Sequence, residues 1–244
     1  MKKKLCLLLL CLCLASSTAC GNNVKSDDSP QKENAVTTQK KNAKINVDNL
    51  DEIVTEDVEK TITSLREEAD TLIAEIDTYD KYLENVDKID AFYKKIYEEN
   101  KLLCNRLREY SLSCVNGIMA SNKSKEDKSD DLEELFDCIY DDAADEIYDE
   151  ILEGIFEDLH KAFYNGILDD AFDSISYDEW ADIYDAEYER WSDVSSDAYD
   201  DWSDFRSDVY DLYSDIDRAL WRDKPEKAEK AIADFKATIE KNKE

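Results

Sequence analysis

The chain has 244 residues, with 31 Lys and Arg against 61 Asp and Glu, which gives a formal net charge of −30. A protein this acidic repels nucleic acid, so we expect no nucleic-acid partner; the charge favours basic proteins or peptides, or divalent cations. Only 4 Gly and 2 Pro are present, and strands need the turns that these residues form, so we expect an all-α fold of long helices in an elongated helical bundle or coiled coil.

Residues 1–19 have the pattern of a signal peptide. Lysines at residues 2–4 precede an apolar run at residues 5–14, and small residues follow up to Ala19. A positive start, a short apolar stretch and small residues before a cleavage point are typical of secretory signals. Cleavage after Ala19 removes three lysines and no acid, which takes the net charge from −30 to −33.

The stretch Ser17-Thr18-Ala19-Cys20-Gly21 resembles the lipobox of bacterial lipoproteins, although Ser17 stands where that motif usually has Leu. The resemblance covers the export segment alone. It implies that the Cys20 thiol receives a diacylglycerol and that the protein is lipid-anchored in the cell membrane, on its extracytoplasmic face. Two or more acyl chains suffice for stable anchoring. The alternative is an ordinary signal peptide followed by an incidental cysteine.

Residues 20–50 are predicted to be a flexible tether because most of them are polar, mixed in charge and without sustained periodicity. The helical body is therefore expected at residues 51–244. From Ile62 the apolar residues recur in alternating steps of three and four, which is typical of a coiled-coil seam. The alternation slips near Asn85-Val86-Asp87, either as a stammer or as a helix break, so residues 55–119 are expected to form one long helix or two in line.

Residues 121–131 contain no apolar residue and are predicted to be a linker. After it, apolar pairs recur every four residues from Leu135-Phe136 to Ala171-Phe172. Four residues advance ~400° in an α-helix, so this apolar stripe should drift by ~40° per step. We therefore expect the stripe to wrap past several neighbouring helices, or the helix to break or bend near Gly154, Gly166 or residues 174–176.

Four copies of an 11-residue unit follow at residues 180–223, with the sequences WADIYDAEYER, WSDVSSDAYDD, WSDFRSDVYDL and YSDIDRALWRD. An 11-residue period fits a nearly straight helix. Unit positions 1, 4 and 8 share one face and are mostly aromatic or apolar, position 9 flanks that face, and the aspartates at position 3 lie opposite. Core packing is the favoured interpretation. The alternative is a stripe for a cationic or glycan ligand, formed by Tyr188, Trp191, Tyr199, Trp202 and Tyr210.

Residues 224–243 are predicted to form a short C-terminal helix. Asp223 is expected to cap it, and Pro225 suits its first turn. The helix carries several lysines, and we expect it to pack antiparallel along the acidic repeat helix and to offset part of the charge of that helix.

The body contains three cysteines and one histidine. Cys114 and Cys138 lie equally far from Glu126, the centre of the predicted linker, on opposite sides of it, so an antiparallel hairpin would place them at the same height. A disulfide between them is therefore weighed against two free, buried thiols. His160 falls in an apolar column and is expected to be a packed core residue, not a ligand or catalytic group.

The sequence carries no motif for a catalytic nucleophile, a phosphate-binding cofactor loop, a zinc site or a calcium loop. It therefore predicts no catalytic residue, no cofactor and no built metal site. The favoured function is that of a membrane-anchored bacterial surface lipoprotein whose helical body acts in interaction or in structure. The alternative is a lipoprotein that binds a cationic or glycan ligand through aromatic and acidic side chains.

Overall fold

The computed structural model describes residues 45–243; the predicted signal peptide, Cys20 and most of the predicted tether lie outside them. These residues are helical apart from short connections and contain no strand, which confirms the all-α fold. Within them, five helical rods pack against one another. The rods are α1 (Val47–Glu75), α2 (Tyr79–Ala120), a third rod that joins α3 to α6 (Lys125–Ala171), α7 (Tyr177–Trp221) and α8 (Pro225–Lys241).

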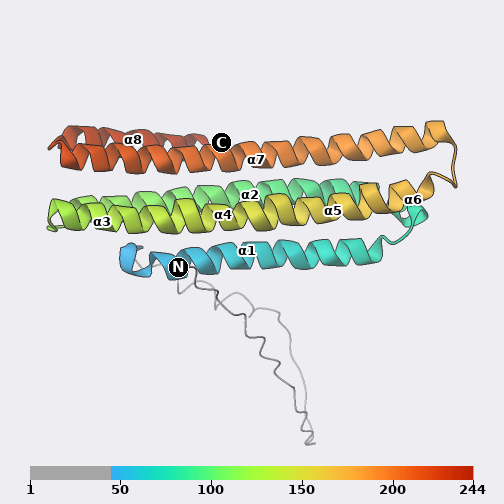
Figure 1. Ribbon diagram of the computed structural model, residues 1–244, viewed down its shortest axis with the longest axis horizontal. Coiled ribbons are helices and arrows are strands. Elements are labelled where there is room, and N and C mark those ends of the chain that lie inside the picture. Colours follow the sequence, from blue (N-terminus) through green and yellow to red (C-terminus); the bar gives the residue numbers. More distant parts are fainter. Residues whose placement is uncertain (1–44, 244) are drawn as a thin grey trace, which may run out of the picture. The chain divides into compact units, whose positions relative to one another are not determined.

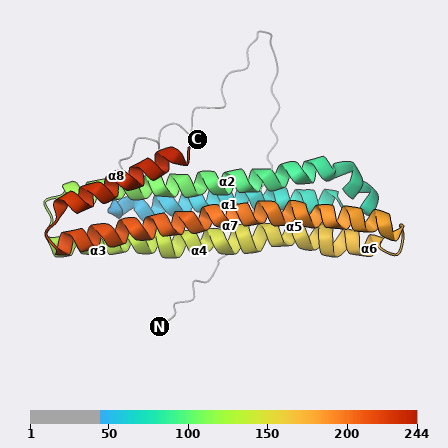
Figure 2. The ribbon, with the colours of Figure 1, turned by 90° about the horizontal axis from the view of Figure 1, so that it is seen from above.

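α2 and the third rod form the middle of this bundle, with α7 on one side and α1 on the other (Figures 1 and 2). In the view of Figure 1 the third rod faces the reader and α2 lies behind it. α8 folds back along the C-terminal part of α7 and also contacts α2. α2 has 42 residues and α7 has 45, so each is ~65 Å long at 1.5 Å per residue and the bundle is elongated, as predicted.

The first two helices form an antiparallel hairpin, so the prediction of helices in line through residues 55–119 is wrong. The chain turns between Glu75 and Tyr79, whereas Asn85-Val86-Asp87 lies inside α2. The turn contains neither Gly nor Pro. Instead Thr78 caps α2, its side-chain oxygen accepting a hydrogen bond from the backbone N–H of Lys81 at 3.4 Å, and Ile76 is buried in the core.

The connection between α2 and α3 covers only residues 121–124, so the linker predicted at 121–131 is too long. Its second half is the beginning of a capped helix. The Asp127 backbone N–H donates to Ser124 Oγ at 3.1 Å, and the Ser124 N–H donates back to Asp127 Oδ2 at 3.4 Å. Such reciprocal capping satisfies donors that a helix N-terminus otherwise leaves free. Likewise α1 begins at Val47, within the range predicted as tether.

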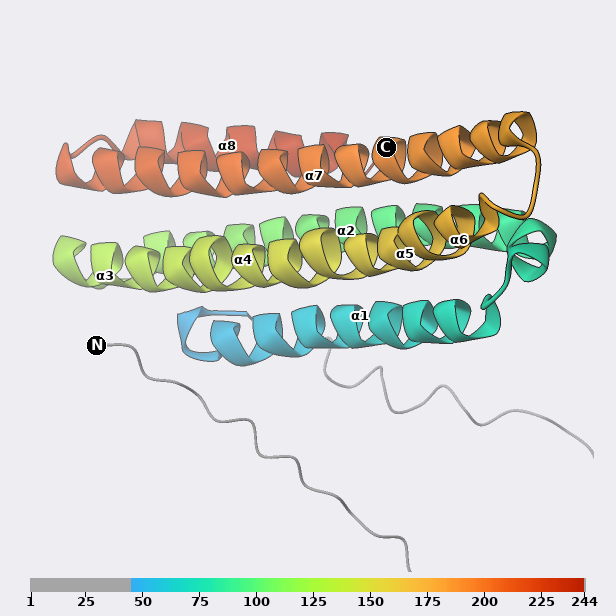
Figure 3. The same cartoon turned by 45° about the vertical axis from the view of Figure 1, so that its right-hand side comes forward.

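The third rod is one unbroken helical run in which α-helical and π-helical segments alternate (Figure 3). A π-helix closes i→i+5 hydrogen bonds and therefore holds more residues per turn than the 3.6 of an α-helix. The mixture brings the mean close to ~4 residues per turn, which matches the spacing of the apolar pairs. The segments are α3 (Lys125–Phe136), η2 (Asp137–Ala143), α4 (Ala144–Ile147), η3 (Tyr148–Ile155), α5 (Phe156–Ala162), η4 (Phe163–Leu168) and α6 (Asp169–Ala171).

The π-helical segments keep the apolar stripe on one side of the rod, so the predicted drift is wrong. In a uniform α-helix the seven four-residue steps from Leu135 to Phe163 would turn by ~280°. Gly154 and Gly166 lie inside η3 and η4 without breaking the rod, which ends just before residues 174–176. Every fourth residue of the column is buried: Leu135, Ile139, Ala143, Ile147, Ile151, Ile155, Leu159 and Phe163.

The repeat units share the single helix α7, which ends at Trp221. Asp223 adopts a left-handed φ of 53°, and Lys224 occupies the N-cap position expected for Asp223. α8 lies antiparallel to α7, as predicted (Figure 1). Its Lys230 pairs with Asp234 of the same helix, so this lysine offsets the charge of α8 itself.

Gly154 and Gly117 are predicted to respond differently to alanine. A Cβ on Gly154 would lie 2.6 Å from Arg66 Nη2 and 3.0 Å from the Asp149 carbonyl oxygen, whereas one on Gly117 meets nothing within 4 Å. Gly117→Ala should therefore stabilise the protein by up to about 1 kcal/mol, the usual advantage of Ala over Gly in a helix. Gly154→Ala should lose that gain, because Arg66 must move away from its ion pair with Glu150. Chemical unfolding measures both, and equal gains would contradict close packing of α1 on η3.

Candidate functional site

A ladder of four ring pairs joins the third rod to α7. The first residue of each repeat unit packs against a ring of the third rod or, in the first unit, against Phe172, which directly follows that rod. Successive partner rings are separated by one residue more than the first residues of successive units. Three turns of α7 take about 11 residues and three turns at ~4 residues take about 12, so the π-helical segments restore the register at each rung. The pairs are Trp180–Phe172, Trp191–His160, Trp202–Tyr148 and Tyr213–Phe136, with ring centroids 4.9, 4.0, 4.9 and 4.5 Å apart.

The aromatic residues singled out in the repeats divide between core and surface. Trp202 is buried, and its Nε1 donates to the Ala144 carbonyl at 2.8 Å; Trp191 is half-buried. Tyr188, Tyr199 and Tyr210 keep 47%, 46% and 51% of their surface exposed. The tryptophans therefore pack the two rods together, while the tyrosines line a partly open seam between them.

His160 is part of the ladder. It is 8% exposed and stacks on Trp191 at 4.0 Å and on Tyr164 at 4.6 Å between ring centroids. Its Nδ1 has no hydrogen-bond partner among the described residues. Burial lowers the pKa of the imidazole, which is therefore neutral near pH 7. In this structure His160 is a packed aromatic ring.

Arg206 shows how a guanidinium fits into the seam. Its Cζ lies 4.3 Å from the ring centroid of Tyr140 and 5.2 Å from that of Trp202, and its Nη1 is 3.3 Å from Asp145 Oδ1. A cation over an aromatic face gains about 0.5–1 kcal/mol at an exposed site. The seam thus combines two ring faces with a carboxylate around one positive group.

The most deeply buried charge of the described bundle lies on the other side of α7, where it meets α2. The Glu187 side chain is 0% exposed. Tyr82 donates to Glu187 Oε2 at 2.7 Å, Tyr93 donates to Oε1 at 3.0 Å, and Arg190 Nη1 also donates to Oε2. Arg190 Nε lies 3.9 Å from Asp90 of α2. Burial raises the pKa of the Glu187 carboxyl, against the opposing effect of these donors.

Further polar contacts follow along the same α2–α7 interface. Asn100 Nδ2 donates to the Ala198 carbonyl at 3.0 Å. Arg108, which is 3% exposed, donates from Nε to Asp208 Oδ2 at 2.8 Å. Buried polar groups cost desolvation energy, and a shifted register would leave them without partners, so such layers specify one register.

Glu187 was missed in the sequence, although a signal for it exists. It occupies position 8 of its unit, where the other three units have Ala198, Val209 and Leu220. A single carboxylate in an otherwise apolar column indicates a buried polar contact. Because the side chain is fully buried and both oxygens accept hydrogen bonds, the arrangement ties α7 to α2 and offers no free carboxylate to a substrate.

Cys104, Cys114 and Cys138 are free, buried thiols in this structure. The hairpin turns at residues 121–124, and not at Glu126 as the placement of Cys114 opposite Cys138 assumes. Cys138 is therefore seven residues further from the turn than Cys114, but the Cys114 thiol is near enough to contribute to the raised pKa of Cys138. Burial raises the pKa of Cys104 to about 12, of Cys114 to about 11 and of Cys138 to about 12, so the reactive thiolate is scarce at neutral pH.

Two further findings bear on the kind of site that the body offers. Within residues 45–243, no group of three or more His, Cys, Asp or Glu is placed to hold a metal ion. Over the same range, no helix combines the length and the apolar character needed to cross a bilayer.

Removal of the Glu187 carboxylate is predicted to destabilise the protein strongly. Glu187→Ala leaves Arg190 and two tyrosine hydroxyls without their buried acceptor, which should cost about 3 kcal/mol. Glu187→Gln keeps the shape and one acceptor oxygen and should cost about 1–2 kcal/mol. Glu189→Ala, at an exposed position two residues further on, is the matched control and should stay within about 0.5 kcal/mol of the wild type. Urea unfolding ranks the three variants.

The difference in stability between the wild type and Glu187→Gln is predicted to depend on pH. Because the folded pKa of Glu187 lies above its ordinary value, the folded state takes up this proton first as the pH falls. The contribution of this group to stability therefore grows on acidification and is lost as the pH rises through the folded pKa. Relative to Glu187→Gln, the wild type should gain stability between pH 7 and about pH 5. A difference that does not change with pH would contradict the raised pKa.

The ring ladder joins the third rod to α7 along a half-exposed aromatic seam, and the Glu187 contacts join α7 to α2. No protein-family model, no curated protein and no solved structure matches this chain. A function for this chain is therefore inferred from the chemistry of its own residues.

Proposed function

We propose that the protein is a non-catalytic interaction module, anchored through Cys20 at the outer face of a bacterial membrane, that binds a basic partner protein. The partner would contact the acidic face, defined here as the outward surface of α1, the third rod and α7. The observation that carries this proposal is the unequal distribution of charge among the rods.

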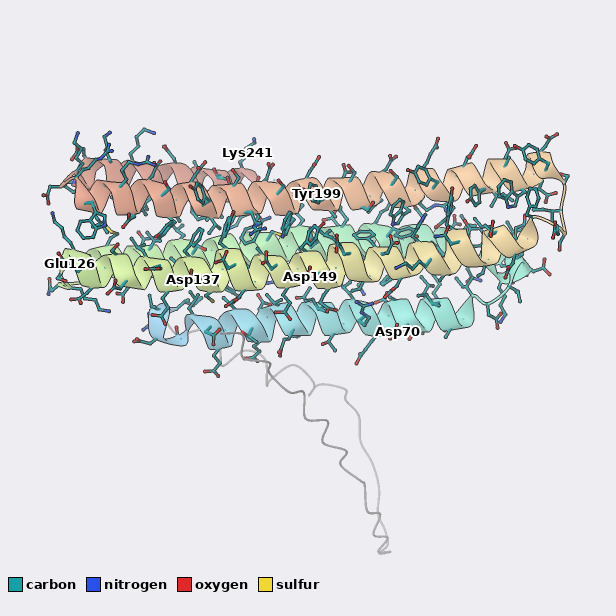
Figure 4. The ribbon with its side chains drawn as sticks, viewed as in Figure 1. Asp70, Glu126, Asp137, Asp149, Tyr199 and Lys241 are labelled. Carbon is teal, nitrogen blue, oxygen red and sulfur yellow. The ribbon has the colours of Figure 1, made fainter. Side chains whose placement is uncertain are left out.

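The net negative charge of the bundle comes from three of its five described rods. α2 carries seven acids and seven bases, and α8 carries four of each, so both are neutral. α1 carries ten acids and two bases. The third rod carries eighteen acids and three bases, and α7 carries fifteen acids and three bases. In Figure 1 the third rod and α7 lie in front of α2 and α8, and α1 borders the third rod on the side opposite to α7. Figure 4 marks Asp70 on α1 and Asp137 and Asp149 on the third rod.

A face with so many more acids than bases attracts positively charged proteins over a distance. Opposite charges steer a partner towards the face and raise the association rate, and salt weakens the attraction over a Debye length of ~8 Å at physiological ionic strength. α2 and α8 lack this excess, so the attraction favours one side of the bundle. A binding role therefore explains why the acids are not spread evenly.

The interior of the bundle suits a rigid binding platform. The ring ladder fixes the third rod against α7, and the Glu187, Asn100 and Arg108 contacts fix α7 against α2. A preordered surface loses little conformational entropy on binding. The deepest carboxylate has both oxygens occupied, which supports a role without catalysis.

The membrane anchor is supported by the sequence before the body. Residues 17–21 resemble a lipobox, and a polar stretch follows Cys20. A polar stretch of this length would hold the body away from the bilayer, where the acidic face remains accessible to partners.

Neutralising the acidic face is predicted to weaken binding of a basic polypeptide, with polylysine as the probe. Asp141, Asp149 and Asp193 are exposed on the third rod and α7, and their change to Asn removes three charges from the face. The matched control changes Glu84, Asp87 and Glu98, exposed on α2, to Gln or Asn. The first triple variant should bind polylysine about tenfold more weakly at low salt, and the control by less than about threefold.

Calorimetric titration of the full chain in detergent micelles measures these affinities. Equal losses in the two triple variants would mean that polylysine responds to net charge alone, and the proposed acidic face would then be wrong.

Replacement of Cys20 is predicted to release the protein from the membrane. Cys20→Ala removes the thiol that would receive the lipid, and no helix within residues 45–243 is able to span a bilayer in its place. The variant should move from the membrane fraction to the soluble fraction of the cells, and the mass increase expected on Cys20 should disappear. A variant that stays in the membrane fraction would argue against a lipid anchor at this residue.

A further inference from the structure

The ring ladder makes the repeat units structurally equivalent. A step of one unit along α7 corresponds to a step one residue longer along the third rod, as the four ring pairs show. For each side chain at one rung, the equivalent residue at the next rung is therefore found by moving one unit along α7, or one residue more than a unit along the third rod. The position of Arg206 in the seam can be followed in this way.

In the third unit the seat of Arg206 has three walls. Trp202, four residues earlier on α7, provides one ring face, Tyr140 of the third rod provides the other, and Asp145 provides the carboxylate. Arg206 is the fifth residue of its unit. The seat is therefore defined by position 1 of the unit and by two residues of the third rod.

The first unit has an equivalent seat that is filled by a ring. Its position 5 is Tyr184, which stacks on Trp180 of position 1 at 4.3 Å and on Tyr164 of the third rod at 3.8 Å between ring centroids. Tyr164 lies two steps of the third rod beyond Tyr140. The equivalence therefore holds for the rings as well as for the sequence.

The second unit has an equivalent position one step away from the third-unit seat. There Trp191 replaces Trp202, Leu152 replaces Tyr140 and Glu157 replaces Asp145. All three are half-buried. Position 5 is Ser195, a small side chain that bonds back to the Ser192 carbonyl at 3.3 Å. Glu157 pairs with Lys161 at 3.5 Å, and such a surface pair contributes only about 0–1 kcal/mol, so it yields readily to a better partner.

We propose that this second-unit seat, formed by Trp191, Leu152 and Glu157 around Ser195, binds an arginine side chain from a basic segment of the partner protein. The inference rests on the proposed function, because it names the group by which that partner is recognised. The guanidinium would pack against the Trp191 ring as Arg206 packs against Trp202, and would pair with Glu157 as Arg206 pairs with Asp145.

Two features select arginine over lysine at this seat. A planar guanidinium stacks on an aromatic face and at the same time directs N–H donors to a carboxylate, whereas an ammonium is a compact, strongly hydrated charge. The half-exposed Tyr188 lies 5.8 Å from Trp191 between ring centroids and extends the aromatic wall. Charge alone attracts both cations, and the ring adds the preference.

The test compares two short peptides, one of alternating arginine and glycine and one of alternating lysine and glycine, titrated into the full chain in detergent micelles. The wild type should bind the arginine peptide about fivefold more tightly than the lysine peptide. Ser195→Arg supplies its own guanidinium to the seat, as Arg206 does in the next unit, and should reduce this ratio to about one.

Ser196→Arg is the matched control, because it adds the same charge at an exposed position ~100° further around the same helix. It should weaken both peptides alike and keep the fivefold ratio. Arg206→Ser opens the third-unit seat to the peptide and should raise the ratio for arginine. Circular dichroism and unfolding confirm that each variant is folded.

The outcomes separate this inference from the proposed function. If Ser195→Arg and Ser196→Arg both keep the arginine preference, or if the wild type has none, the seat is wrong while binding through the acidic face stands. If neither peptide binds the wild type even at low salt, both proposals fail. Loss of the preference in Ser195→Arg alone supports the seat.

Discussion

Two helices that pack along their whole length must cover the same height between contacts, and here they do so with different numbers of residues. α7 presents one ring in each repeat unit. The chain of the third rod is one residue longer between successive rings than the chain of α7, as the pairs Trp202–Tyr148 and Trp191–His160 show. Only a helix wound to ~4 residues per turn keeps such a register, so the third rod alternates α-helical with π-helical segments. The position of every other contact on α7 follows from this pairing.

With the ring ladder on one side of α7, each remaining face of that helix carries its own kind of side chain. The side towards α2 carries the buried Glu187, the Ala198 carbonyl and Asp208, which find partners only in one register. The outward side carries acids, and the edge between ring ladder and solvent carries the half-exposed tyrosines. One repeating pattern thereby serves packing, register and surface chemistry.

The helical character of the chain could be predicted because it depends on local properties, namely scarce Gly and Pro and sustained apolar spacing. The turn at residues 76–78 could not, since Ile76 continues the apolar rhythm and Thr78 caps a helix without any Gly or Pro. The four-residue rhythm predicts a drifting stripe if the winding is that of an ideal α-helix, whereas the rod packed against α7 has a wider winding. Glu187 depends on two tyrosines of α2 that are distant in the sequence, and only its place in an apolar column hinted at them.

The neutral rods α2 and α8 lie behind the acidic third rod and α7 in the view of Figure 1, so the body has an electric moment across its width. A rod of this kind experiences a torque near a charged sheet. Beside a bilayer rich in anionic lipids, within about one Debye length of ~8 Å, the acidic side turns outward and the α2–α8 side turns towards the lipid head groups. The unequal charge of the rods would in this way orient the whole body, without any specific contact to the membrane.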